Sequence, residues 1–348
     1  EDVTPLGSPI LVSPSGVSWE VYRLGELDGE GRIYLSTTEN GTTTNWAALP
    51  GVMGEASTIS DPAVVVTAPQ HKLVFYRDSQ GAIRFTEYQS GVWRSAPVAL
   101  PEQETYILLP LVVKMNTTSS SSLQPEYWHD LNSNEQVTSA SPSELSAISR
   151  NENHAAVFFV DENNRLWVNE WTNHNRSDWS DTDWVVLMEN VSIEKPAVTS
   201  RHINHLAVAV RDTGGMPYII EWTQNLNGTG EPGWEEPYAL GKILDGPLAI
   251  TSGSLDSLSI FGTDTGGTVW QLDWLEDDGW SEWTSTGLNI EGEAASRIMT
   301  AVVRRLGDIM LLYRDEQHCA GYVHYTSLGV TPIESPISFG EETQGYPL

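Results

Sequence analysis

The chain has 348 residues, a formal net charge of −29 and a pI of about 4.4, with 14 tryptophans and a single cysteine, Cys319. Its 18 Lys and Arg against 47 Asp and Glu leave little basic surface for phosphate groups, which argues against a nucleic-acid partner and against an anionic membrane surface. No run approaches about 18 consecutive apolar residues, so no spanning helix is expected, and one cysteine excludes a disulfide framework and a cysteine-based zinc site.

Along the chain, one unit of short apolar strands recurs around an aspartate. The first copy lies near residues 18–51 and contains SWEVYRL, GRIYLSTTE and NWAALPG. In the later copies a β-branched stretch comes first, an apolar run ends at the aspartate, a short turn follows, and another apolar strand leads to a closing tryptophan. These repeat aspartates are Asp78, Asp130, Asp161, Asp212, Asp264 and Asp315.

This repeating pattern predicts an all-β fold, because three or four short strands per unit of about 50 residues are typical of propeller blades. We predict a single seven-bladed β-propeller domain over residues 1–348, with six blades as the alternative. The interval from Asp130 to Asp161 is 31 residues, whereas the other intervals are 51 or 52, so the third blade (about 103–142) is expected to be irregular.

Several scarce cationic residues recur at matching positions of the repeat. His71, His154 and His205 stand seven residues before their aspartates, and Arg150, Arg201 and Arg304 stand eleven before theirs. One interpretation is that they converge on one face as a positive patch for an anionic small ligand. The other is that the histidines cap turns and the arginines pair with nearby acids. Tyr127 and His129 of the irregular third blade are expected to line a pocket, and no metal or cofactor is expected.

A second set of cations directly precedes the repeat aspartates, at Arg77, Arg211 and Arg314, with His129 in the third blade. We expect it on the opposite face, engaged in local ion pairs.

The units FGTDTGGTVWQLDWLEDDGWSEWTSTGL and VFYRDSQGAIRFTEYQSGVW resemble blades of the fucose-specific lectin-like propellers. In that family an Arg, a Glu and an aromatic ring bind the sugar between blades. The family's Arg position holds Leu73, Ala156, Ala207, Ser259 and Met310 here, and its Glu position holds Phe85, Val168, Ile219 and Gln271. A fucose site of that kind is therefore not expected.

The resemblance extends at the level of fold to fungal lyases that cleave rhamnose from glucuronate. It implies β-elimination at a uronate, with Arg150, Arg201 and Arg304 binding the carboxylate and His154 or His205 as the base, assisted by His71. The expected partner is then an acidic plant or microbial glycan. The alternatives are a lectin with a non-fucose site and an inert extracellular scaffold.

Five N-x-S/T sequons, at Asn40, Asn116, Asn175, Asn190 and Asn227, favour a secreted, N-glycosylated extracellular protein. The start at Glu1 without methionine is expected if a signal peptide has been removed. We further expect a monomer.

Overall fold

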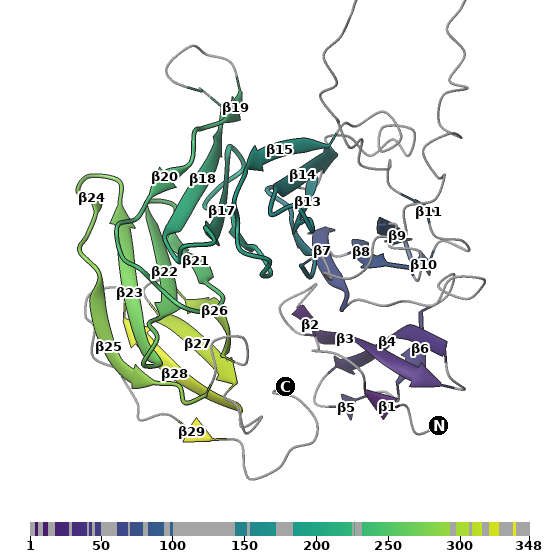
Figure 1. The fold of residues 1–348 in the computed structure, drawn as a ribbon. Coiled ribbons are helices and arrows are strands. Elements are labelled where there is room, and N and C mark those ends of the chain that lie inside the picture. Colours follow the sequence, from purple (N-terminus) through teal and green to yellow (C-terminus); the bar gives the residue numbers. More distant parts are fainter. Residues whose placement is uncertain are drawn as a thin grey trace, which may run out of the picture.

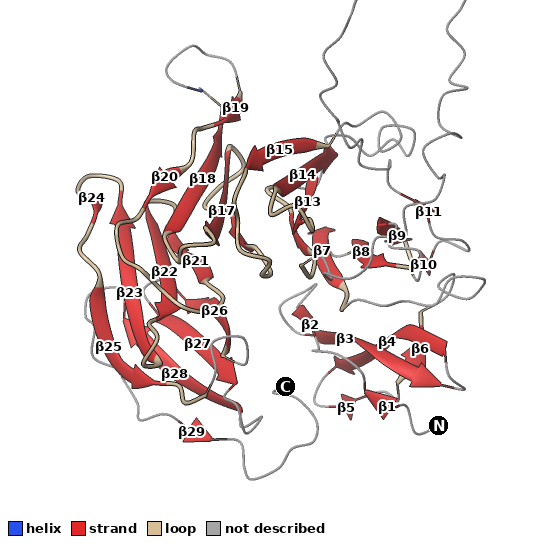
Figure 2. Cartoon of the chain, in the orientation of Figure 1, coloured by secondary structure: helices blue, strands red, loops and turns tan. Residues whose placement is uncertain are grey.

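Among the described residues, the named elements, β1 to β29, are all strands (Figure 2). They are seen in a computed structural model that describes the following residues: 4–5, 10–12, 18–27, 30–39, 42–43, 46–49, 61–68, 70–78, 83–93, 98–99, 143–151, 154–171, 184–224, 226, 232–292, 297–305, 308–314, 320–326 and 337–338. None of these residues belongs to a helix long and apolar enough to cross a membrane.

The strands form six antiparallel sheets that succeed one another along the chain (Figure 1). Sheet I contains β1 (Thr4–Pro5), β2 (Ile10–Val12), β3 (Ser18–Leu27), β4 (Glu30–Glu39), β5 (Thr42–Thr43) and β6 (Ala47–Ala48). Sheet II contains β7 (Ala63–Ala68), β8 (His71–Arg77), β9 (Ile83–Gln89), β10 (Val92–Trp93) and β11 (Val98–Ala99). Sheet III contains β12 (Ser146–Ile148), β13 (Ala155–Val160), β14 (Leu166–Trp171) and β15 (Val185–Met188).

The later sheets repeat the same meander. Sheet IV contains β16 (Ala197–Thr199), β17 (His205–Arg211), β18 (Pro217–Thr223), β19 (Gly233–Trp234) and β20 (Tyr238–Ala239). Sheet V contains β21 (Ala249–Ser254), β22 (Ser257–Thr263), β23 (Thr268–Leu275), β24 (Gly279–Trp280) and β25 (Thr284–Asn289). Sheet VI contains β26 (Ile298–Arg305), β27 (Asp308–Arg314), β28 (Ala320–Thr326) and β29 (Ile337–Ser338). In sheets II to VI the first four strands are neighbours in chain order, as the sequence predicts for blades, while β11, β20 and β25 pair with the third strand of their sheets.

The repeat aspartate organises the turn between the second and third strands. In sheet III, Asp161 Oδ1 accepts hydrogen bonds from the backbone N–H of Asn163 (2.9 Å) and Arg165 (2.8 Å). Its Oδ2 accepts the indole N–H of Trp167 at 2.9 Å. Asp264 of sheet V makes the same three kinds of contact, so the carboxylate fixes the hairpin turn to the strand that follows it.

Adjacent sheets pack face to face, and one hydrophobic cluster fills each space between them. Strand β17 shows the two-residue period that this requires. Its Leu206 and Val208 face the cluster shared with sheet III, while Ala207 and Ala209 face the cluster shared with sheet V. The second strands are therefore buried on both faces, and their apolar side chains hold the sheets together.

Residues 103–142, predicted as an irregular third blade, lie outside the described residues. The sheets on either side of this segment pack directly against each other. Phe75 and Phe85 of sheet II belong to the same core cluster as Val157, Phe159 and Trp167 of sheet III. The described residues thus give six successive sheets with no further sheet between II and III.

Candidate functional site

The three histidines of the repeat open the second strands of sheets II, III and IV. His71 and His205 are the first residues of β8 and β17, and His154 directly precedes β13. Each pairs through Nε2 with a glutamate carboxylate on the third strand of its own sheet. The distances are 2.9 Å for His71 to Glu87, 3.1 Å for His154 to Glu170 and 2.7 Å for His205 to Glu221.

The strand register explains this pairing. In sheet IV, Glu221 lies directly opposite Ala207, two residues beyond His205 on the neighbouring strand. Side chains two residues apart point to the same face of a sheet, so His205 and Glu221 meet on a diagonal. His205 and His154 are each only 1% exposed, which makes them part of the packed interior.

Two arginines of the repeat lie against aromatic rings of the following sheet. The Arg150 guanidinium carbon is 3.6 Å from the ring centroid of Trp222, and that of Arg201 is 4.1 Å from the ring centroid of Trp274. Arg201 Nη2 also lies 3.9 Å from Glu221 Oε1. Burial lowers the pKa of both arginines, with Glu170 and Glu221 acting in the opposite direction. These are cation–π contacts between neighbouring sheets.

An equivalent set of five residues (one Arg, one His, one Glu and two Trp) therefore recurs in two successive spaces between sheets. The III–IV set consists of Arg150, His154, Glu170, Trp222 and Trp234. The IV–V set consists of Arg201, His205, Glu221, Trp274 and Trp280. The space between sheets II and III carries a reduced version, in which Thr67 replaces the arginine and contacts His71, whose ring lies 6.1 Å from that of Trp171.

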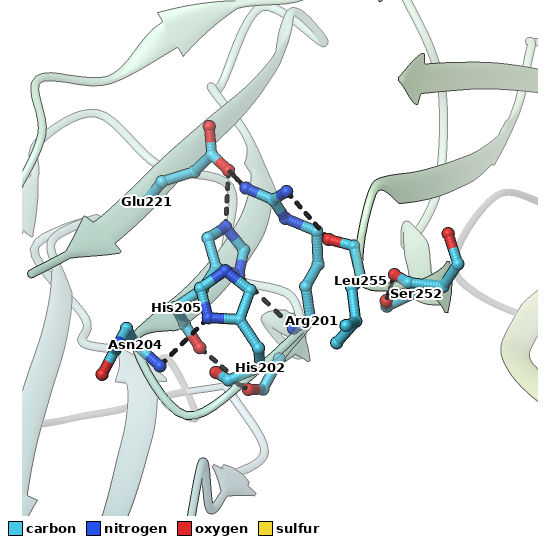
Figure 3. A network of polar contacts seen from close by, with 9 residues as sticks. Arg201, His202, Asn204, His205, Glu221, Ser252 and Leu255 are labelled. Carbon is cyan, nitrogen blue, oxygen red and sulfur yellow. Dashed lines mark hydrogen bonds and ion pairs between the residues drawn. The ribbon is translucent and has the colours of Figure 1, made fainter. Parts of the chain in front are cut away.

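The IV–V set borders an open hollow of about 570 Å³. Glu221 Oε1 is hydrogen-bonded to His205 and forms an ion pair with Arg201 (Figure 3). No described residue donates a hydrogen bond to its Oε2. The pKa of Glu235 is raised by burial and by the negative charge of Glu221. The lining consists of Glu221, Glu235, Glu236, Tyr238, Gly279 and Trp280.

The predicted histidines and arginines do not converge on one site but are divided among successive spaces between sheets. His71, His154 and His205 are each bound to a glutamate of their own sheet. Arg150 and Arg201 each lie on a tryptophan of the next sheet. Burial lowers the pKa of His154, although its hydrogen bond to Glu170 acts to raise it. Arg304 lies in β26, but its side chain is outside the described part, as are Tyr127 and His129 entirely.

Sequence reasoning missed the acidic partners. Nine residues after each described repeat aspartate stand Glu87, Glu170, Glu221 and Asp273. This recurrence behind the aspartate is the sequence signal that identifies the histidines' partners. In sheet V the acid has other partners, since Asp273 Oδ1 accepts hydrogen bonds from Ser259 (2.6 Å) and Gln271 (2.9 Å).

Of the second set of cations, Arg77 and Arg211 have described side chains, and both contact residues distant in the sequence, contrary to the local ion pairs expected. Arg211 donates to the Leu244 carbonyl at 2.6 Å and to the Glu194 carboxylate, so it pairs with Glu194 and not with the aspartate that follows it. The Arg77 guanidinium lies 4.6 Å from the ring centroid of Phe159 in sheet III. Burial lowers the pKa of Arg77 to about 10, against the opposing effect of Asp161. Among the described residues, no group of three or more His, Cys, Asp or Glu side chains is placed to hold a metal ion.

Neither the known protein families nor the curated proteins include a match to this chain. Solved structures do match it. The BP39L lectin from Burkholderia pseudomallei superimposes with a TM-score of 0.64 at 13% identity, covering 95% of this chain and 83% of the lectin. The SapL1 lectin, solved with α-methyl fucoside, gives a TM-score of 0.56 at 14% identity, covering 97% of both chains.

A lectin from Aleuria aurantia, described as a six-bladed β-propeller that recognises fucose, gives a TM-score of 0.51 at 10% identity. It covers 99% of this chain and 100% of the lectin. The chain therefore shares the β-propeller fold of these lectins. At these identities the likeness establishes the fold.

Proposed function

We propose that this protein is a carbohydrate-binding lectin that takes a neutral sugar between sheets IV and V, in the hollow beside Glu221. The observation that carries the proposal is the Glu221 carboxylate, which has one anchored oxygen and one that accepts no hydrogen bond from the described part of the chain, at an open hollow beside Trp280. A carboxylate accepts hydrogen bonds from sugar hydroxyls, and an aromatic ring packs against the apolar face of a pyranose. Few polar groups among aromatic side chains are the usual composition of a ligand pocket.

The neighbouring residues orient the carboxylate in advance. His205 is buried and bound to Glu221, and Arg201 is held between Glu221 and the Trp274 ring. A ligand that binds here does not have to immobilise these side chains, which lowers the entropic cost of binding. His205 and Arg201 are thus positioning residues.

The charge of the hollow favours a neutral sugar over the uronate expected from the sequence. Glu221, Glu235 and Glu236 all line it, so a ligand carboxylate would enter a region that is already crowded with negative charge. The predicted catalytic histidines are also engaged, since His154 and His205 are buried and paired. Both points favour the lectin interpretation over a β-eliminating lyase, as does the likeness to solved lectins.

The test begins with a glycan array and continues with calorimetric titration of the best neutral ligand. Glu221→Gln should weaken binding at least tenfold, because a hydrogen bond to a charged acceptor contributes about 1.5–3 kcal/mol. Glu282→Gln is the control, because this exposed carboxylate of sheet V does not line the hollow. Unchanged affinity in Glu221→Gln would contradict the proposal. If uronate glycans bind and the absorbance of an unsaturated uronate then rises, the protein is a lyase and the lectin proposal is wrong.

We also take the six-bladed alternative, which the direct packing of sheets II and III supports. Secretion with N-glycosylation, and a monomeric state, remain part of the proposal. Asn190, which begins a sequon, is exposed in a turn between β15 and β16. Glycosidase treatment of protein expressed in a secreting eukaryotic host, followed by light scattering, should show a mass shift and a single chain. An unmodified or dimeric product would contradict these two points.

A further inference from the structure

Two tryptophans occupy equivalent places in sheets IV and V. Trp234 of β19 is paired in register with Trp222 of β18, and Trp280 of β24 is paired with Trp274 of β23. Each stands on the fourth strand of its sheet and faces the glutamate of the preceding sheet. We call the space between two successive sheets, with the side chains that line it, a joint. Because the two tryptophans are equivalent in the repeat, any difference between their contacts is a property of the individual joint.

The surroundings of the two glutamates differ because of these tryptophans. Trp234 donates its indole N–H to Glu170 Oε1 at 2.7 Å, while His154 binds Oε2 of the same carboxylate. Both oxygens of Glu170 are thus engaged within the protein. Trp280 makes no described hydrogen bond to Glu221, and the hollow opens between the two residues.

The ring of Trp234 is also held in place by packing. It meets Phe158 of sheet III edge-on, with ring centroids 5.8 Å apart and an interplanar angle of 87°. It belongs to the periphery of the hydrophobic cluster between sheets III and IV. Edge-to-face aromatic packing adds to the hydrogen bond, so the indole is fixed on Glu170 from two sides.

We propose that Trp234 prevents sugar binding at Glu170, in the joint between sheets III and IV. Its indole N–H occupies the acceptor that a sugar hydroxyl would use, so this protein binds sugar at Glu221 and not at Glu170. The inference rests on the proposed function in assigning a sugar to this kind of joint. To bind Glu170, a sugar hydroxyl would have to displace the Trp234 indole N–H. That donor belongs to the same chain and is present at an effective concentration of about millimolar or more, so a free sugar competes with it poorly.

Closure of the joint can be measured without any sugar. In proton–nitrogen NMR spectra, the Trp234 and Trp280 indole signals are assigned by their loss in Trp234→Phe and Trp280→Phe. Hydrogen exchange of the Trp234 indole should be at least tenfold slower than that of Trp280, because Trp234 donates its indole N–H to Glu170 whereas the Trp280 indole N–H donates to none of the described residues. Equal exchange rates would overturn the proposal.

Binding provides the second arm, using the neutral glycan selected for the wild type. Glu170→Gln should leave wild-type binding unchanged, whereas Glu221→Gln should weaken it at least tenfold. Trp234→Phe, which keeps an aromatic ring but removes the indole N–H, should add one binding site per chain, and adding Glu170→Gln to that variant should remove the new site. The first comparison needs no change at Trp234, so it remains decisive if Trp234→Phe fails to fold.

The outcomes separate the two ideas. Equal losses in Glu170→Gln and Glu221→Gln, or a folded Trp234→Phe with unchanged stoichiometry, would overturn the closure of the III–IV joint while leaving the lectin intact. If no glycan binds the wild type or Trp234→Phe, the proposed function is wrong. The exchange rates of the two indoles then still decide whether Trp234 closes its joint.

Discussion

Replacing Asp161 by alanine should destabilise the protein much more than a surface substitution. The carboxylate accepts hydrogen bonds from the backbone N–H of Asn163 and Arg165 and from the indole N–H of Trp167. The arginine side chain adds a further contact at 2.9 Å. Alanine removes every one of these acceptors at once.

The magnitude depends on which donors can reach water instead. Trp167 is 4% exposed, so its indole N–H would remain buried without a partner, at a cost of about 1–3 kcal/mol. The two turn N–H groups are partly accessible, and each loses a net hydrogen bond of about 1 kcal/mol. The Arg165 ion pair adds little, because such pairs near the surface are screened. The expected loss in the free energy of unfolding is about 4 kcal/mol.

Urea denaturation followed by tryptophan fluorescence measures this loss, and sheet V supplies the matched control. Asp264 accepts the same kinds of hydrogen bond, but its partner Trp270 is only half-buried and regains water when the acceptor is lost. Asp264→Ala should therefore cost about 2 kcal/mol. A loss below about 1 kcal/mol in Asp161→Ala, or a larger loss in Asp264→Ala, would refute this reasoning.

Two further predictions concern pH and a turn. Because burial lowers the pKa of His154, the unfolded chain binds a proton below pH 6.5 that the folded chain resists. Stability should thus fall on acidification by at most about 1.4 kcal/mol per pH unit from this residue, and His154→Gln should remove that part of a thermal-unfolding pH profile. Gly267→Ala should cost several kcal/mol, because at φ +82° the new Cβ lies 2.2 Å from the Ile290 carbonyl oxygen. Gly241→Ala, at φ +87° but with no atom within 4 Å of the new Cβ, should cost about 1 kcal/mol in the same denaturation assay. Equal losses in the two variants would contradict the steric argument.

Much of the fold was accessible from the sequence because its determinants are local. Alternating apolar residues and the Asp161-type turns act within one hairpin, so strand order within the sheets could be predicted. The number of blades was less accessible, because it depends on whether residues 103–142 separate sheets II and III. The packing of Phe75 against Val157 and Phe159 answers that question only in three dimensions.

The candidate site was predicted less well, for a physical reason. His205 finds its partner sixteen residues away through strand register, and Arg201 finds its aromatic ring in the next sheet. Equal spacing along the chain indicates equal position in a sheet but does not show which contact satisfies each side chain. Trp234 and Trp280 illustrate the limit, since both follow a glycine in similar strands and only one reaches a glutamate.

The stacking of Arg150 on Trp222 and of Arg201 on Trp274 means that the repeating object is the joint between sheets, and each repeat of the sequence supplies half of two joints. Loss of the arginine from one repeat would leave the tryptophan of the next repeat without its cation, and loss of that ring would leave the arginine without its aromatic contact. Neighbouring repeats are therefore constrained to change together, and a joint can acquire or lose a binding position while the sheets that form it stay the same.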